Sequence, residues 1–164
     1  MLTEETTLQN DLTARFPVLA GHIRVARARR VFAEVEYEQF PTLFEYLVRE
    51  SGFSILCMIT GLDLGERLGL IYHLARESGV TLNLQTSVPK SNPVVQTVTS
   101  YFPAADCYER EVIDLLGIEV QGLPPGSRYP LPDSWPAGQF PLRKDWKECE
   151  MDNFELGDEP CPTK

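Results

Sequence analysis

The side chains with the greatest potential for chemistry lie between Asp106 and Asp114. The stretch "DCYEREVID" holds four carboxylates and one arginine, and helical spacing places them within about three turns. Asp106, Arg110 and Asp114 recur every four residues, so Arg110 is expected between two carboxylates on one helix face, with Glu109 and Glu111 flanking it. Paired carboxylates can perform acid–base catalysis. The alternative is a capped helix whose surface ion pairs are each worth about 0.2–0.5 kcal/mol.

No other part of the sequence supplies the groups that an independent active site would need. The two histidines, His22 and His73, lie far upstream of the carboxylates. The motifs GxGxxG, GxxxxGK and GxSxG do not occur. Because no complete set of catalytic roles can be filled, we expect no catalytic site in this chain. We interpret the charged helix as facing a partner, where breaking a partly desolvated ion pair costs several kcal/mol.

A second charged cluster, Arg143, Lys144 and Asp145, lies near the C-terminus in the stretch "GQFPLRKDW". No helix or strand period runs through it, and most of the 13 prolines follow residue 88. The same region carries a tyrosine, a phenylalanine and two tryptophans, which is unusual for a disordered tail. We therefore predict an extended arm that is ordered by packing, partly on its own domain and partly on another protein.

The four cysteines are Cys57, Cys107, Cys149 and Cys161, and no two of them have CxxC spacing. A zinc or iron–sulfur site within the chain is therefore not expected. Cys57 lies in the apolar stretch "SILCMIT" and is predicted to belong to the core. Cys149 and Cys161 could pair in the tail, but a cytosolic setting favours four free thiols.

Length and charge narrow the functional class. A chain of 164 residues fits one domain with an arm, and 43% hydrophobic residues can form a packed core. The net charge of -9 disfavours nucleic-acid binding, and the basic run "RVARARR" is interpreted as solvent-facing side chains. No apolar run approaches the roughly 20 residues of a membrane span, and the N-terminus resembles no secretory signal. We expect a cytoplasmic protein that meets a membrane only through a partner.

The first half of the sequence predicts two helices and a hairpin. Residues 3–16 form a helix with Thr3 as its N-cap and a stripe of Leu8, Leu12 and Phe16. The alternation over residues 22–36 predicts a two-stranded hairpin with one apolar face. Residues 39–52 form the next amphipathic helix.

Residues 53–90 predict two or three strands, with turns near "DLGE" and "RESG". The run 55–59 is apolar on both faces, which predicts a central strand. A last helix, Ala105–Leu116, is predicted with Asp106 as N-cap, Glu109 completing a capping box, and Gly117 just past its end.

The expected fold class is α+β: two layers, a mixed or antiparallel sheet with helices on one face, and an extended irregular C-terminal arm. We divide the chain into an α+β domain at 1–120 and a Pro-rich docking arm with an acidic tail at 121–164.

These motifs carry a resemblance to a known family. The stretch "AADCYEREVIDLLGIEV", followed by "LPDSWPAGQFPLRKDW", resembles the 30-kDa subunit family of respiratory complex I, the NADH-quinone oxidoreductase. That family includes the equivalent subunit of energy-converting, membrane-bound NiFe hydrogenases. The upstream block "GFSILCMITGLDLGERLGLIYHL" is also similar to the family, so the resemblance covers residues 35–146.

Two departures indicate a branch of the family. Cys107 stands where complex I members usually have tryptophan, and "GLPPGSRYP" stands where they usually carry His-Pro-Asp-Leu-Arg. The form "WPAGQFPLRKDW" is more similar to the hydrogenase-type relatives. We therefore prefer the hydrogenase branch to the complex I branch.

The resemblance implies a subunit without a catalytic site or cofactor of its own. It would brace the large catalytic subunit and the small iron–sulfur subunit in the cytoplasmic arm of a membrane-bound complex. Fe-S clusters and the Ni-Fe centre would belong to those partner subunits, and electron transfer there would be coupled to ion translocation. A complex I-type subunit, a stand-alone assembly adaptor and a free-standing carboxylate enzyme are the alternatives.

The resemblance also implies partner-facing residues. Arg143 and Lys144 are expected on the large subunit, where an arginine can bind a carboxylate through two parallel hydrogen bonds. Alternatively "PLRKD" folds back on the acidic helix of its own domain, at Glu109, Glu111 or Asp114, and the two contacts are compatible. Asp145 is expected to neutralise one of the two cations. The predicted subunit interface comprises Glu109, Arg110, Glu111, Asp114, Trp135, Phe140, Arg143, Lys144, Asp145 and Trp146.

Overall fold

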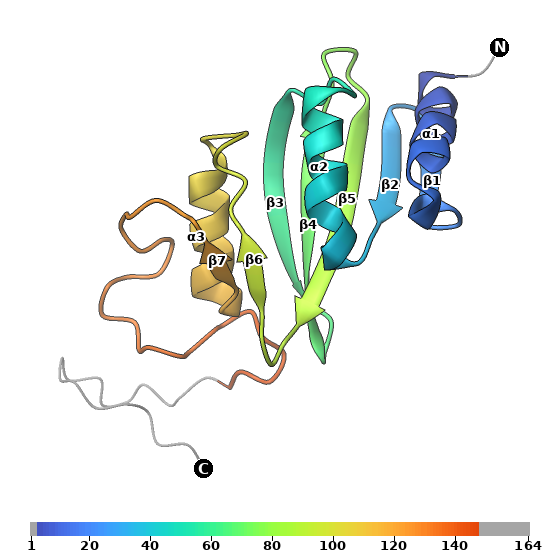
Figure 1. Cartoon of the computed structure of the whole chain (residues 1–164). Coiled ribbons are helices and arrows are strands. Elements are labelled where there is room, and N and C mark those ends of the chain that lie inside the picture. The colour runs from blue at the N-terminus through green and yellow to red at the C-terminus, as the bar shows by residue number, and fades with distance from the viewer. Residues whose placement is uncertain (1–2, 148–164) are drawn as a thin grey trace.

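The computed structural model describes residues 3–147 (Figure 1). Its α-helices are α1 (Glu4–Arg15), α2 (Phe40–Arg49) and α3 (Ala105–Leu116), and two short 3-10 helices are η1 (Pro17–Leu19) and η2 (Tyr37–Gln39). The strands are β1 (Ile23–Arg27), β2 (Arg30–Glu34), β3 (Ile55–Asp63), β4 (Arg67–Ala75), β5 (Thr81–Pro89), β6 (Val94–Gln96) and β7 (Glu119–Gln121).

Five strands form a mixed sheet in the order β1-β2-β5-β4-β3. The β2–β5 pair is parallel, and the other three pairs are antiparallel. A second, two-stranded sheet pairs β6 with β7 in parallel, and α3 is the crossover that a parallel pair requires. The mixed α+β fold predicted from the sequence is confirmed.

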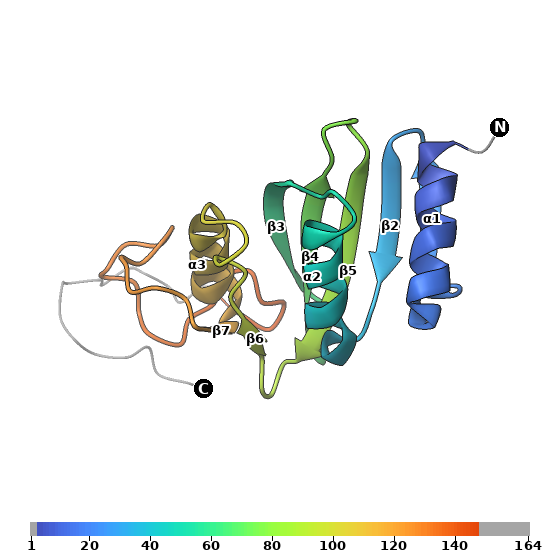
Figure 2. The ribbon, with the colours of Figure 1, turned by 45° about the horizontal axis from the view of Figure 1, so that its top comes forward.

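The N-terminal helix forms as its sequence predicts. The Thr3 side chain accepts a hydrogen bond from the backbone N–H of Thr6 at 3.3 Å, so Thr3 is the N-cap. Leu8 and Leu12 lie on one stripe and are buried. Figure 1 and Figure 2 both show α1 beside the β1 end of the sheet, whereas α3 lies beyond β3 at the opposite end.

One face of the main sheet carries the core. Tyr72 of β4 is buried there against Phe40 and Phe44 of α2, with ring centroids 4.6 and 5.4 Å apart. Gly61 of β3 faces α3 so closely that a Cβ there would collide with Leu116. The strand register places Gly61 two residues from the partner of Tyr72, so α2 and α3 cover the same face, as predicted.

The prediction of a central strand at residues 55–59 is wrong. These residues belong to β3, an edge strand, and β5 is the central strand. Ile55 and Met58 are 47% and 45% exposed, and Cys57, predicted to lie in the core, is also exposed. Helices cover only one face of the sheet, so alternate residues of an apolar run stay outside.

The region after β7 has no helix or strand up to Lys147, and we call residues 122–147 the arm. Figure 1 shows the arm looping past α3 and returning toward the end of the main sheet. The division of the chain at residue 120 stays a prediction; that position lies inside β7.

Candidate subunit-docking site

Glu109 lies on the buried side of α3 and is only 2% exposed. Its carboxylate accepts hydrogen bonds from the backbone N–H of Val98 at 2.7 Å and from the Thr97 hydroxyl at 2.6 Å. Burial raises the pKa of this carboxyl group, although both hydrogen bonds oppose the change. Glu109 therefore fastens the chain after β6 to α3.

The predicted capping box is wrong. The helix begins at Ala105, one residue before the proposed N-cap Asp106, and no side chain caps it. The Glu109 carboxylate reaches across to residues 97 and 98 instead of back to the helix start. The backbone N–H of Val98 binds Glu109 in place of the amide at the helix start, because tertiary folding buries it beside this carboxylate.

The expectation that Arg110 lies between Asp106 and Asp114 is half right. Arg110 binds both carboxylate oxygens of Asp106, at 3.0 and 2.8 Å, and donates to the carbonyl oxygen of Pro124 at 2.7 Å. Asp114 is 7% exposed and accepts instead from Arg128 at 2.9 Å and from the backbone N–H of Leu131 at 3.2 Å. Asp114 thus holds the arm directly, and Asp106 does so through Arg110.

The end of α3 is the anchor for Arg143. The guanidinium donates to the carbonyl oxygens of Leu116 at 2.7 Å and Gly117 at 3.4 Å, and it lies 4.4 Å from the centre of the Phe140 ring. A cation is favourable here because the last carbonyls of a helix carry partial negative charge. The segment "PLRKD" thus folds back on its own domain, as one alternative predicted, but Arg143 binds the backbone at the end of α3 and not a carboxylate of that helix.

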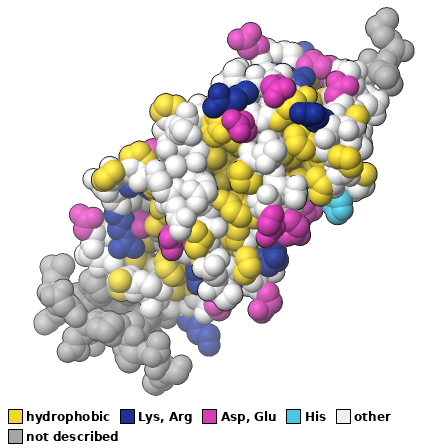
Figure 3. Space-filling model, viewed as in Figure 1, with side chains coloured by type: hydrophobic (Ala, Val, Ile, Leu, Met, Phe, Trp, Pro, Cys, Tyr) yellow, Lys and Arg dark blue, Asp and Glu magenta, His cyan; other side chains and the backbone are white. Residues whose placement is uncertain are grey.

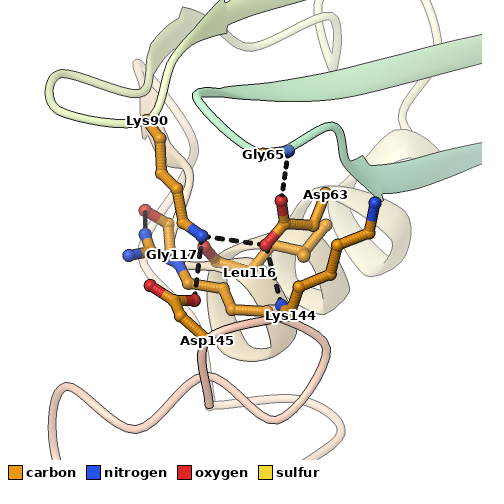
Figure 4. A network of polar contacts seen from close by, with 8 residues as sticks. Asp63, Gly65, Lys90, Leu116, Gly117, Lys144 and Asp145 are labelled. Atoms are coloured by element: carbon orange, nitrogen blue, oxygen red, sulfur yellow. Dashed lines mark hydrogen bonds and ion pairs between the residues drawn. The ribbon is translucent and has the colours of Figure 1, made fainter.

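Asp63, at the end of β3, joins the sheet to the arm (Figure 4). Its side chain is 2% exposed and accepts from the backbone N–H groups of Gly65 and Lys144, at 2.7 and 2.8 Å. The Lys90 ammonium donates to Asp63 at 2.9 Å and to Asp145 at 2.8 Å. Asp145 therefore pairs with Lys90, not with Arg143 or Lys144 as predicted.

The charges in this network shift one another's protonation. The Lys90 hydrogen bond is the main cause that holds the pKa of Asp63 far below its usual range, and the Lys144 and Gly65 amides add to it. The same lysine lowers the pKa of Asp145, while Asp145 and then Asp63 raise the pKa of Lys90. At neutral pH all three groups carry charge, so the network stays closed.

The two tryptophans of the arm pack on each other and share one glutamine. Their ring centroids are 6.3 Å apart. The indole N–H of Trp135 donates to the backbone carbonyl of Gln139 at 2.9 Å, and the indole N–H of Trp146 donates to the side-chain oxygen of Gln139 at 3.0 Å. Together with the contacts to α3 and Asp63, these bonds order the arm on its own domain, which is one half of the prediction made for it.

Among residues 3–147, exposed apolar side chains gather where β3, α3 and the arm meet. Met58, Tyr129 and Leu142 are 45%, 47% and 56% exposed. Met58, Glu111 and Leu142 line one hollow between β3 and α3. Tyr129 lies near this hollow, because Cys107 and, to a smaller extent, Glu111 raise its pKa. We call Met58, Cys107, Glu111, Tyr129 and Leu142 the β3–α3 patch.

Comparison with known proteins identifies the family. The model of the respiratory-chain NADH dehydrogenase 30 Kd subunit matches residues 33–150.

The chain belongs to this 30-kDa subunit family.

Relatives of this 30-kDa-type subunit come from several complexes. This chain is 32% identical over 144 residues to a subunit of the F(420)H(2) dehydrogenase of Methanosarcina mazei, and the match covers 86% of this chain and 90% of the relative. It is 28% identical over 157 residues to the beta subunit of the membrane-bound hydrogenase of Pyrococcus furiosus, covering 89% and 88%. A chain in the structure of the membrane-bound sulfane sulfur reductase, described as an archaeal respiratory membrane complex, superposes with a TM-score of 0.77 at 26% identity, covering 88% and 86%.

The structure separates the predicted interface residues into two groups. Eight make contacts within the chain: Phe140 packs against the Arg143 guanidinium, and the other seven form hydrogen bonds, namely Glu109, Arg110, Asp114, Trp135, Arg143, Asp145 and Trp146. Within residues 3–147, the side chains of Glu111 and Lys144 form no hydrogen bond or ion pair. Whether any of the ten touches a partner stays a prediction.

Sequence reasoning missed Asp63, Lys90 and Arg128, which anchor the arm. It counted Tyr129 and Leu142 among the apolar residues of the arm but left them out of the predicted interface. Asp63 and the Lys144 amide are 81 positions apart, so no local period connects them. The one available signal for Asp63 was its position before Gly65 in "DLGE", where an aspartate commonly accepts from the backbone two residues on.

Residues 3–147 contain no group of three or more His, Cys, Asp or Glu side chains placed to hold a metal ion. No helix in this range has the length and apolar character to cross a bilayer. Cys57 and Cys107 are free and exposed, and Cys149 and Cys161 lie outside the described residues. The expectations of no cofactor and no catalytic site stay predictions.

Proposed function

We propose that this 30-kDa-type protein is a structural subunit of a membrane-bound, energy-converting NiFe hydrogenase. It braces the large catalytic subunit against the small iron–sulfur subunit on the cytoplasmic side of the complex. The Fe-S clusters and the Ni-Fe centre belong to those partners, and this chain carries neither catalytic residues nor a cofactor.

One observation carries the proposal: the arm is fixed on its own domain while an apolar surface beside it stays open. Asp63, Asp114 and the carbonyls that end α3 are each bound to the arm. A pre-ordered arm loses little conformational freedom on docking. The β3–α3 patch has the exposed apolar centre and the nearby charge that are typical of a protein interface.

The hydrogenase branch is supported by the beta subunit of the membrane-bound hydrogenase, which aligns over nearly all of both chains. A second candidate is a subunit of a complex I-type oxidoreductase. The family description favours it, because it names the 30 Kd subunit of the respiratory-chain NADH dehydrogenase. The structural role proposed for the chain is the same in both complexes.

The test is affinity purification of the tagged chain from its native host, with metal analysis of the subunits that come with it. A complex that contains nickel in a large subunit supports the hydrogenase, and one that contains iron without nickel supports the second candidate. Recovery of the chain alone, even after gentle lysis, contradicts both.

Matched variants test the surface. Tyr129→Asp and Leu142→Asp place a charge in the β3–α3 patch and are expected to reduce recovery of the large subunit at least tenfold. Val18→Asp is the control, because Val18 is similarly exposed at 44% and lies next to α1 at the other end of the molecule. Equal recovery with all three variants would show that docking uses another surface.

A further inference from the structure

The β1–β2 hairpin carries a concentration of positive charge that the proposed docking does not use. Arg24, Arg27, Arg29 and Arg30 lie within seven residues, in a chain of 15 basic and 24 acidic residues. The first three are exposed and Arg30 is half-buried. We call these four residues the arginine hairpin.

The arginine hairpin holds four of the eight cations that form no ion pair within residues 3–147; the other four are Arg15, Arg143, Lys144 and Lys147. Within residues 3–147 none of its four arginines forms an ion pair. The cations that do are Arg49, Arg67, Arg76, Lys90, Arg110 and Arg128. Figure 3 shows acidic and basic side chains scattered over one face of the molecule without a large patch of a single sign. Four unpaired arginines on one hairpin are therefore a local exception.

The hairpin also has two features that destabilise it: a pair of like charges and a strained backbone angle. Arg27 and Arg30 are directly opposite each other in the register, and like charges in that position repel. Arg29 has a φ of 60°, and it is the one non-glycine residue with positive φ between residues 3 and 147. A glycine at position 29 and one polar neutral residue at 27 or 30 would remove both costs.

The backbone of the hairpin is nevertheless held firmly. The Glu5 carboxylate accepts a hydrogen bond from the backbone N–H of Arg29, and Glu5 is 7% exposed. The carbonyl oxygen of Arg29 accepts from the backbone N–H and the hydroxyl of Thr81, both at 2.9 Å. The fold thus fixes the turn while the side chains of Arg24, Arg27 and Arg29 stay exposed to solvent. Unfavourable local features that the surrounding structure maintains are characteristic of functional surfaces.

We propose that the arginine hairpin is a docking site for an acidic segment of another protein chain. A guanidinium binds a carboxylate through two parallel hydrogen bonds, and a cluster of them is matched by a run of Asp and Glu. A net charge of -9 disfavours a polyanion as extended as nucleic acid or an anionic bilayer, whereas a short acidic segment meets only the hairpin. The hairpin lies at the opposite end of the molecule from the β3–α3 patch (Figure 1), so this inference goes beyond the proposed function.

Binding of a fluorescent poly-glutamate peptide to the full chain tests the proposal. The double variant Arg27→Gln/Arg29→Gln is expected to weaken binding about tenfold at low salt. The control Arg49→Gln/Lys147→Gln removes the same charge from exposed positions elsewhere and is expected to change binding less than about twofold. Equal losses in both double variants overturn the proposal. Hairpin-dependent binding to phosphatidylserine vesicles without binding to the peptide would also overturn it, in favour of a membrane surface.

Two further variants separate binding from folding and probe the native complex. Arg29→Gly is expected to raise the melting temperature and still weaken peptide binding, since glycine tolerates the positive φ; a lower melting temperature would make Arg29 a structural residue.

Arg27→Lys introduces an amine that a carbodiimide joins to a carboxylate in direct contact. In the purified complex we expect a cross-link to an acidic residue of another subunit, and cross-links only within this chain contradict the proposal.

Discussion

At the residue scale, two buried carboxylates respond in opposite directions to the protein around them. Glu109 is desolvated, and burial raises its pKa. Asp63 is surrounded by three hydrogen-bond donors, which lower its pKa. The difference is one of partners: Asp63 faces the Lys90 ammonium, whereas Glu109 meets only a neutral hydroxyl and one amide.

Glu109→Gln is expected to change how stability depends on pH. Because the pKa of Glu109 is raised in the folded state, its contribution is most favourable below the unfolded value of 4.5 and weakens as pH rises through the folded value. Glutamine can accept from Val98 and donate to Thr97 without a charge. The variant should therefore become more stable relative to the wild type as pH rises from about 4 to 8. Urea unfolding across that range measures it; a constant difference would contradict it.

Asp63→Asn should act with the opposite sign. A lowered pKa stabilises the fold above the unfolded value of 3.8, and this contribution is lost as pH falls. Asparagine has one acceptor for three donors, so we expect a loss of about 2 kcal/mol at pH 7. The stability difference between Asp63→Asn and the wild type should shrink as pH falls below 3.8. Asp11→Asn, at an exposed position on α1, is the control and should leave stability nearly unchanged. A similar loss in this control would contradict the stabilising role given to the hydrogen bonds of Asp63.

At the element scale, the C-terminus of α3 is the point on which the arm rests. Gly117 ends the helix in the left-handed region, with a φ of 68°, and its missing side chain leaves room for Phe140 and Arg143. A Cβ at Gly117 would lie 2.5 Å from the Phe140 ring and 2.7 Å from the Arg143 guanidinium. The same glycine therefore terminates the helix and permits the arm to pack.

Gly117→Ala should release the arm as well as destabilise α3. The left-handed conformation alone costs about 1–2 kcal/mol for alanine, and displacing Phe140 adds to it. Gly138→Ala is the matched control, because Gly138 also has a positive φ of 76° but no atom within 4 Å of the added Cβ. We expect Gly117→Ala to be at least about 1 kcal/mol less stable than this control and to shift tryptophan fluorescence to the red. Equal effects of the two substitutions would argue against the contact.

At the scale of the whole molecule, residues 3–147 form an elongated structure whose two ends carry different elements. Figure 2 shows α1 at one end and α3 with the arm at the other. The apolar β3–α3 patch is at the α3 end, and the arginine hairpin is at the α1 end. A brace between two partners needs two separate contact surfaces, and these two differ in chemistry.

The arm should be ordered before any partner binds. The backbone N–H groups of Leu131, Leu142 and Lys144 donate to Asp114, to the Leu115 carbonyl and to Asp63. Their hydrogen exchange in the isolated chain is expected to be slowed at least about tenfold relative to an unstructured peptide. Addition of the partner should slow them little further. Exchange at the peptide rate would instead mean that docking orders the arm.

The sequence alone determined the local elements and the family. The N-cap at Thr3, the stripe of α1 and the αL position of Gly117 are set by neighbouring residues, so their types predict them directly. The strands β6 and β7 escaped prediction because three residues are too few to show a period. Recognition of the family depended on "EREVID" and "PLRKDW", which are chemical patterns within short segments.

Only the tertiary structure decided what the charged residues bind. Arg143 and Asp145 lie next to Lys144 in the sequence, yet each finds its partner elsewhere: the α3 carbonyls for Arg143 and Lys90 for Asp145. Charges exert their effect through space, and a folded chain brings together groups that lie 81 positions apart. Partner choice is therefore a property of the packed molecule, whereas helix ends and strand periods are properties of a few adjacent residues.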